Sequence, residues 1–212
     1  MHTIDLIRFN TYVPPIDLTF NQYLLLSDEF TLLIHTGNMK IGQGLLADVQ
    51  RRLNGRTLDG IFISHFESDE CGSIALFINA YPEVVVYCSE VSARELAGFG
   101  IKANTHVVSS ESVITKAGVT LKFLTYPSEV HLWNGLLLYE QERKILFSSD
   151  LVFAFGDFCD YTTERTLEKC VDSIAAYQIP NPDSLSSMKE TLSNLDVQYI
   201  APGHGPAIEV IK

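Results

Sequence analysis

Long apolar runs are missing from this chain. No stretch of about 18 consecutive apolar residues occurs, which excludes a transmembrane helix by length. The first residues lack a basic region followed by an apolar core, so we expect no secretory signal peptide. The four cysteines include no pair with C-x-x-C spacing, and nothing indicates a disulfide framework. We therefore expect a cytoplasmic protein with reduced thiols and no membrane association.

Positive charge is also scarce. Lysine and arginine number 15 against 26 aspartate and glutamate residues, which gives a formal net charge of -11. Such a surface repels polyanions, so nucleic acid and anionic membrane surfaces are disfavoured as partners. The chain of 212 residues contains no repeat, low-complexity segment or Gly/Ser linker. We expect one domain over residues 1–212 with a sizeable core.

Strand and helix patterns alternate in both halves of the chain. Strands are expected over residues 22–26, 31–35, 61–64, 84–88, 107–108, 113–116, 119–124, 136–139, 144–147 and 197–200. One helix is expected to end at Gly55. Four others are expected over residues 72–81, 91–97, 164–177 and 185–195. Two mixed halves of this kind favour an α/β (α+β) fold in which two sheets pack face to face with helices outside.

The segment His65-Phe66-Glu67-Ser68-Asp69 follows the apolar run 60–64. In an extended segment every second side chain points the same way, so His65, Glu67 and Asp69 are expected to converge. One imidazole and two carboxylates form a mixed nitrogen and oxygen set. Such a set suits iron or manganese better than a thiolate-preferring metal, although zinc also accepts these groups.

Three further candidate ligands each follow an apolar segment that resembles a strand. They are His131, Asp150 and His204, the last within Ala201-Pro202-Gly203-His204-Gly205-Pro206. Ligands at strand ends gather along one edge of a two-sheet fold, so all six candidates are compatible with a single metal site.

The six positions together resemble the metallo-β-lactamase superfamily, and more narrowly the metal domain of flavodiiron proteins and stand-alone oxygen-binding diiron proteins. Hydrolases of the superfamily carry H-x-H-x-D-H, whereas the diiron branch carries Glu at the second ligand position, as Glu67 does here. The order of the six residues matches, as does the 19-residue step between His131 and Asp150 (150 − 131). The resemblance implies the αββα four-layer sandwich.

By this resemblance His65, Glu67 and His131 bind one iron, Asp69 and His204 bind the other, and Asp150 bridges them. The cofactors implied are two Fe ions, with Zn or Mn as alternatives. The function implied is binding or reduction of O2 or NO, as a sensor or as a reductase with an external electron donor or signalling partner. A homodimer is expected from the resemblance alone.

Three departures from the family pattern bear on function. Glu70 replaces the histidine that binds the second metal in zinc hydrolases. It is a candidate catalytic group, and it could be a hydrogen-bond partner of a ligand, an extra ligand or a helix-start carboxylate. His35 stands where the superfamily usually has Asp, which alters a hydrogen bond behind the ligands. No flavodoxin-like domain is expected after His204, and hence no FMN in this chain. Trp133 is a candidate wall of the metal pocket or a core residue.

Two other functions remain open. A dinuclear metal-dependent hydrolase would use a metal-bound water against an ester, lactone, thioester or phosphodiester. A partner-binding domain with a degenerate, metal-free site would keep the fold and lose the chemistry.

Overall fold

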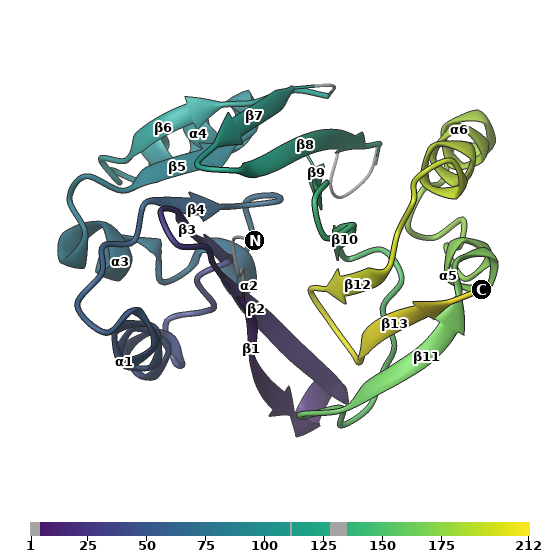
Figure 1. The fold of residues 1–212 in the computed structure, drawn as a ribbon, viewed down its shortest axis with the longest axis horizontal. Helices are drawn as coiled ribbons and strands as arrows, with labels where there is room; N and C mark the ends of the chain where they lie inside the picture. The colour runs from purple at the N-terminus through teal and green to yellow at the C-terminus, as the bar shows by residue number, and fades with distance from the viewer. Residues whose placement is uncertain (1–4, 111, 128–134) are drawn as a thin grey trace. The chain divides into compact units, whose positions relative to one another are not determined.

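A computed structural model describes residues 5–110, 112–127 and 135–212 of the chain (Figure 1). Within these ranges, the elements are β1 (Asp5–Val13), η1 (Pro14–Ile16), β2 (Leu18–Leu26), β3 (Thr31–Ile34), α1 (Gly42–Leu53), β4 (Gly60–Phe62), α2 (Ser68–Cys71), α3 (Ile74–Ala80), β5 (Val85–Cys88), α4 (Glu90–Gly98), β6 (Asn104–Val107), β7 (Val113–Lys116), β8 (Val119–Tyr126), β9 (Gly135–Glu140), β10 (Ile145–Ser149), β11 (Thr162–Thr166), α5 (Leu167–Asp172), α6 (Pro182–Ser193), β12 (Tyr199–Pro202) and β13 (Ala207–Ile211).

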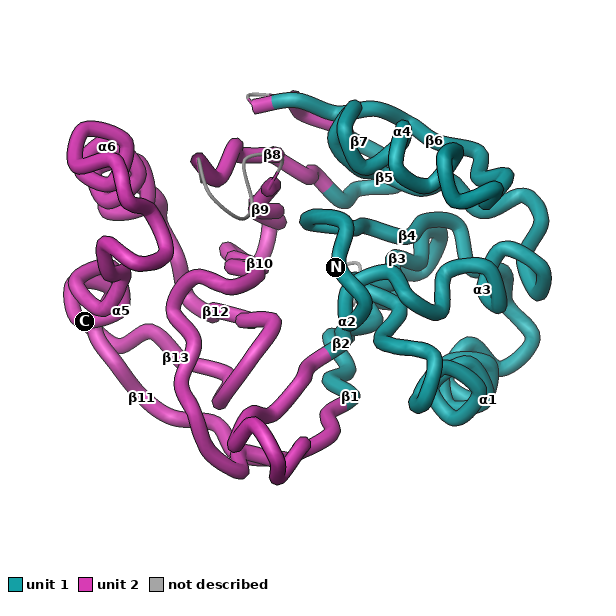
Figure 2. The backbone as a smooth tube through the Cα atoms, turned by 180° about the vertical axis from the view of Figure 1, so that it is seen from behind, with its two compact units in different colours: residues 1–9, 22–109, 115–119 teal, residues 10–21, 110–114, 120–212 magenta. Residues whose placement is uncertain are grey.

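The chain divides into two compact units, drawn in different colours in Figure 2. Unit 1 comprises residues 1–9, 22–109 and 115–119, and unit 2 comprises residues 10–21, 110–114 and 120–212. Each unit has its own apolar core. The prediction of one domain over residues 1–212 stays a prediction.

Unit 1 is built around most of a six-stranded sheet with the order β1-β2-β3-β4-β5-β6. The pairs β3–β4, β4–β5 and β5–β6 are parallel, so their carboxyl ends lie at the same edge. Apolar side chains from these strands pack against α1, α3 and α4. The central strands are buried throughout, which is why their sequences are continuous apolar runs instead of alternating patterns.

Unit 2 holds most of a seven-stranded sheet with the order β11-β13-β12-β10-β9-β8-β7. Here β10 pairs with β12 in parallel and with β9 in antiparallel orientation. Helices α5 and α6 are neighbours, and their apolar residues join the core with side chains of β8, β9, β10 and β12. This arrangement fixes the carboxyl ends of β10 and β12 beside each other.

Several predicted elements need correction. Residues 164–177 are not one helix, because strand β11 covers their start and α5 ends at Asp172. Strands β1, β11 and β13 were not expected from the sequence. The expected extended segment from His65 to Asp69 is wrong in its second half, because α2 begins at Ser68.

The four cysteines are free thiols, as predicted, and three of them are buried.

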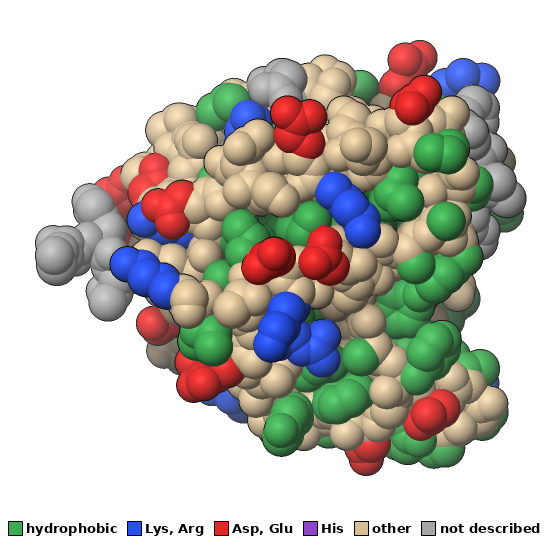
Figure 3. Space-filling view, turned by 90° about the vertical axis from the view of Figure 1, so that its right-hand side faces the viewer, with side chains coloured by type: hydrophobic (Ala, Val, Ile, Leu, Met, Phe, Trp, Pro, Cys, Tyr) green, Lys and Arg blue, Asp and Glu red, His purple; other side chains and the backbone are tan. Residues whose placement is uncertain are grey.

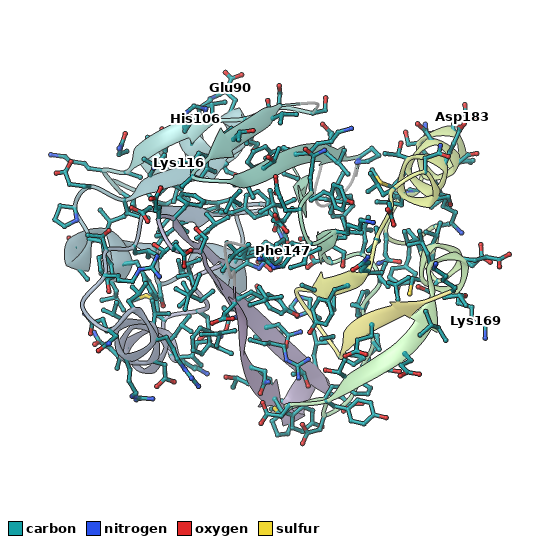
Figure 4. The ribbon with its side chains drawn as sticks, in the orientation of Figure 1. Glu90, His106, Lys116, Phe147, Lys169 and Asp183 are labelled. Atoms are coloured by element: carbon teal, nitrogen blue, oxygen red, sulfur yellow. The ribbon has the colours of Figure 1, made fainter. Side chains whose placement is uncertain are left out.

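The described surface mixes both signs of charge with apolar groups. Figure 3 shows one face on which acidic, basic and apolar side chains are interspersed. In unit 1, the amine of Lys116, a residue labelled in Figure 4, lies 5.1 Å from the centre of the Phe30 ring, an arrangement that stabilises a cation. Across the residues that the structure describes, no helix has the length and apolar character needed to cross a membrane.

A buried carboxylate lies at the β9–β10 turn. Glu140 is fully buried and accepts hydrogen bonds from the backbone N–H groups of Glu142 (3.2 Å) and Arg143 (2.9 Å). Burial is the main cause that raises the pKa of Glu140 to about 7, and a side-chain hydrogen bond with Glu142 raises it further. Folded protein therefore keeps a proton on Glu140 at pH values where unfolded protein has lost it.

Replacing Glu140 tests this coupling. Because the folded pKa lies above the unfolded value, stability is expected to fall as pH rises from about 4.5 to about 7. The Glu140 contribution is on the order of 1–3 kcal/mol. Glu140→Gln should flatten this part of the stability profile, measured by urea unfolding at several pH values. Glu164→Gln, at an exposed residue of β11, controls for the lost charge. An unchanged slope in Glu140→Gln would contradict the assignment.

Candidate metal centre

In unit 1, the candidate ligands follow the carboxyl end of β4. Strand β3 pairs with β4 in the register Leu32↔Gly60, Leu33↔Ile61 and Ile34↔Phe62. Glycine at position 60 allows close packing there, because a Cβ atom would lie 2.8 Å from the Leu32 side chain and 2.9 Å from the Tyr87 ring. The start of β4 is thereby packed between β3 and β5, and the strand leads from there toward His65.

Three nitrogen and oxygen ligand atoms gather in unit 1. The Nε2 atom of His65 lies 3.5 Å from Oε2 of Glu70 and 3.9 Å from Oε1 of Glu67. One ligand atom from each residue lies within 4.8 Å of the others, close enough to hold one ion. His65 and Glu70 are buried, whereas Glu67 is half-buried. A buried imidazole facing two carboxylates is a donor set that accepts a divalent metal ion.

The short helix α2 determines which carboxylates reach His65. Glu67 is its N-cap residue with extended backbone, and the amide and thiol of Cys71 both donate to the Glu67 carbonyl (3.0 and 3.1 Å). The backbone N–H of Thr36 donates to the Glu70 carbonyl at 2.7 Å, which ties α2 to the end of β3. Asp69, on the first turn of α2, is half-buried.

Behind His65, a hydroxyl links two imidazoles. Oγ of Ser64 lies 2.9 Å from Nδ1 of His65 and 2.9 Å from Nε2 of His35. All three side chains are buried. The contact to Nδ1 orients the His65 ring so that Nε2 is the atom that faces Glu67 and Glu70.

In unit 2, Asp150 and His204 come from the ends of two paired strands. Asp150 follows β10 and His204 follows β12, and these strands are parallel. Nε2 of His204 lies 3.3 Å from Oδ1 of Asp150. The amide of Gln178 donates to the Asp150 carbonyl at 2.7 Å. Phe147, which Figure 4 labels, is a buried residue of β10 and comes three residues before Asp150.

Backbone around this pair is sharply bent. Ser149 and Val152 both have left-handed backbone, with φ of 49° and 62°. That conformation is rare for a β-branched residue such as Val152, which indicates that the packing around Asp150 imposes it. Gly205 has φ of 88°, and a Cβ atom there would lie 2.8 Å from the Ala154 backbone nitrogen. The glycine beside His204 therefore permits a tight loop.

One buried asparagine fastens the His204 loop. The side-chain amide of Asn21 donates to the carbonyls of Pro202 (3.0 Å) and Gly205 (2.9 Å), and its backbone N–H donates to the Gly203 carbonyl (2.8 Å). Aromatic rings of Phe20 and Phe153 lie 4.9 and 6.4 Å from the His204 ring. Hydrogen bonds from Asn21 and aromatic contacts with His204 thus both hold the loop in place.

The structure brings some of the predicted residues close together. His65 and Glu67 lie together in unit 1 with Glu70, and Asp150 and His204 lie together in unit 2. His131 and Trp133 lie outside the described residues. Sequence reasoning missed Ser64, Asn21 and Gln178. Ser64 directly precedes a candidate ligand, which is the one signal that could have drawn attention to it.

The fold is that of a protein of the metallo-β-lactamase type, and the nitrogen and oxygen side chains of these two groups follow strand ends. The family model described as "ODP family beta lactamase" matches residues 18–205. The chain therefore belongs to the ODP family of β-lactamase-like proteins.

Solved structures confirm the predicted fold class. A variant of a flavo di-iron protein from Thermotoga maritima superposes with a TM-score of 0.78 at 19% identity, over 97% of this chain and 55% of that one. Rubredoxin oxygen:oxidoreductase from Desulfovibrio gigas gives a TM-score of 0.78 at 17% identity, over 99% of this chain and 58% of that one.

Curated relatives are longer proteins. The anaerobic nitric oxide reductase flavorubredoxin of Vibrio vulnificus is 26% identical over 200 residues, which cover 88% of this chain and 40% of the relative. Diflavin flavoprotein A 1 of Synechocystis is 25% identical over 197 residues, covering 90% of this chain and 34% of the relative. The chain spans about a third to about half the length of the curated relatives it matches.

Removing the Asn21 side chain should loosen the His204 loop. Asn21→Ala leaves two buried carbonyls without their donor, which is expected to lower the free energy of unfolding by about 1–3 kcal/mol. Urea unfolding and amide hydrogen exchange of residues 203–205 measure the effect. Asn10→Ala is the matched control, because that amide makes one exposed hydrogen bond to Asp160. Equal effects of the two substitutions would show that Asn21 does not fasten the loop.

Proposed function

We propose that the protein is a non-haem diiron protein that binds or reduces O2 or NO. Two ferrous ions, if bound, would supply electrons to a diatomic gas. The observation that carries the proposal is the buried Nε2 atom of His65 facing the carboxylates of Glu67 and Glu70. Membership of the ODP family supports it, and relatives carry names that specify nitric oxide or oxygen as substrate.

Six residues are proposed as ligands. His65, Glu67 and His131 would hold one iron, Asp69 and His204 the other, and Asp150 would bridge. The Asp150–His204 contact of 3.3 Å supports the assignment in unit 2, and the His65–Glu67 contact supports it in unit 1. Nitrogen and oxygen donors without thiolate favour iron over metals that prefer sulfur.

Glu70 is proposed to act beside the metal held by His65. Its carboxylate is buried and lies nearer to His65 Nε2 than Glu67 does. With Glu67, Asp69 and Asp150 it raises the negative charge of the proposed site to −4, which equals the +4 of two divalent ions. A buried site with balanced charge avoids the large cost of an isolated buried charge. Trp133 is proposed from its position in the sequence as a wall of the gas pocket.

Sustained reduction of a gas needs a supply of electrons from outside this segment. We propose an external electron donor for a reductase, or a signalling partner if the protein senses its ligand through a stable adduct. A homodimer and a cytoplasmic location complete the proposal. The hydrolase and the metal-free binding domain are its competitors, and metal content separates them from the diiron protein.

Metal analysis of protein purified without oxygen is the first test. The diiron reading predicts about two irons per chain, the count of a dinuclear site. Adding O2 to the reduced protein should produce a new visible absorption band, because iron, unlike redox-inactive zinc, would change oxidation state and absorb visible light. Zinc without a spectral response, together with chelator-sensitive ester hydrolysis, would establish the hydrolase. A folded protein that binds no metal would establish the binding domain.

Replacing one carboxylate should change the metal preference. Glu67→His converts an oxygen donor to nitrogen, and we expect the ratio of iron to zinc bound in competition to fall by about tenfold or more, in line with the effect of ligand type on selectivity. Glu90→His is the matched control, because Glu90 is an exposed residue of α4 in the same unit (Figure 4). Identical metal ratios in Glu67→His and wild type would remove Glu67 from the ligand set.

A further inference from the structure

A chain of three buried side chains runs from the end of β3 to His65. His35 Nε2, Ser64 Oγ and His65 Nδ1 are linked by two contacts of 2.9 Å each. The strand pairing sets up these contacts, because the backbone N–H of His35 donates to the Phe62 carbonyl (3.0 Å) and extends the β3–β4 ladder by one residue. Both histidines and the serine lie inside unit 1.

His35 is held in an unusual conformation that aims its ring at Ser64. Its φ of 65° is in the left-handed region, which residues with a side chain seldom adopt. The ring lies roughly parallel to that of Phe62, with centroids 6.4 Å apart and planes inclined by 22°. Packing therefore maintains a ring position that the backbone alone disfavours.

The chemistry of the Ser64 hydroxyl group determines how protons are arranged along these three hydrogen-bonded side chains. Ser64 has one proton, so it can donate to only one of the two ring nitrogens that contact it. A neutral imidazole carries its proton on one nitrogen and accepts at the other. The chain consequently has two arrangements, one with the hydroxyl proton toward His65 and one with it toward His35.

Only one of these arrangements is compatible with metal at His65. Binding through Nε2 requires a lone pair there, which places the ring proton on Nδ1. Nδ1 then donates to Ser64 Oγ, and the hydroxyl donates to His35 Nε2. His35 is thereby an acceptor at Nε2. In the reverse arrangement Ser64 donates to His65 Nδ1, the proton of His65 is on Nε2, and that nitrogen cannot bind a metal.

We propose that Ser64 and His35 are positioning residues that set the His65 tautomer required for metal binding. The inference rests on the proposed metal site. A carboxylate in place of His35 could only accept a hydrogen bond, so the Ser64 hydroxyl would always donate toward it. A neutral histidine can accept or donate, so in this protein the bound metal itself selects the direction. Metal binding and the proton position on His35 are then coupled through Ser64.

Nitrogen NMR of protein labelled with 15N-histidine tests the arrangement directly, with Zn(II) as a diamagnetic probe that accepts the same ligand types. In the zinc-loaded wild-type protein, Nδ1 of His65 and Nδ1 of His35 should be protonated, and Nε2 of His35 should have the shift of an unprotonated acceptor. A proton on His35 Nε2 in the loaded protein would overturn the proposal. This measurement needs no variant, so it stands even where a substitution prevents folding.

Metal affinity of variants gives the second test. Ser64→Ala should weaken Zn(II) and Fe(II) binding, measured by chelator competition, by about 10–100-fold, the usual effect of removing a group that orients a ligand histidine. His35→Asp should stay within about threefold of wild type, because it keeps an acceptor for Ser64, whereas His35→Ala should weaken binding. Ser27→Ala is the control, since Ser27 is a buried hydroxyl at the opposite end of β3.

The outcomes separate this inference from the proposed function. Wild-type affinity in Ser64→Ala would overturn the positioning role while leaving a diiron function intact. Loss of affinity in Ser64→Ala together with a wild-type protein that shows no response to O2 or NO would support the positioning role and remove the gas chemistry. Equal losses in Ser64→Ala and Ser27→Ala would show a general loss of packing and overturn the specific role.

Discussion

Parallel pairing of β3 with β4 is the constraint on which the candidate site of unit 1 depends. Its register sets Ile34 beside Phe62, and the residues that follow each strand meet at one sheet edge. A slip of one residue would move every side chain to the other face of the sheet. Ser64 would then no longer lie between His35 and His65, and the imidazole would not face Glu67 and Glu70. All residues of β3 and β4 are buried, and their apolar side chains belong to the unit 1 core, so that slip would be costly.

Unit 2 uses the same device with different strands. Asp150 and His204 follow β10 and β12, whose parallel register includes Phe147↔Ala201 and Ser149↔Pro202. The two side chains need a bent backbone after each strand, and the sequence supplies it with Gly205 and with strained conformations at Ser149 and Val152. Strands β10 and β12 thus carry the two candidate ligands to the sheet edge, and short loops held by Asn21 and Gln178 determine their final direction.

Prediction from sequence succeeded where residues are buried on regular strands. The runs before His65, Asp150 and His204 are apolar and short, and each forms a buried strand. It failed for β1, β11 and β13. Strand β11 contains no apolar residue, and the apolar residues of β1 and β13 do not alternate strictly with polar ones. β11 exists because it pairs in parallel with β13, a contact between residues far apart in the chain that a local pattern does not encode.

The sequence by itself determined the types of the candidate ligands, their order and their positions after predicted strands, because these depend on residue identity and local apolar pattern. Tertiary structure decided which of them meet. Glu70 faces His65 because α2 starts at Ser68 and turns that carboxylate inward, which the expected extended segment would not do. His35 reaches Ser64 only because two strands separated by a helix lie in register. Such contacts depend on long-range packing, and no short segment of the chain contains the information.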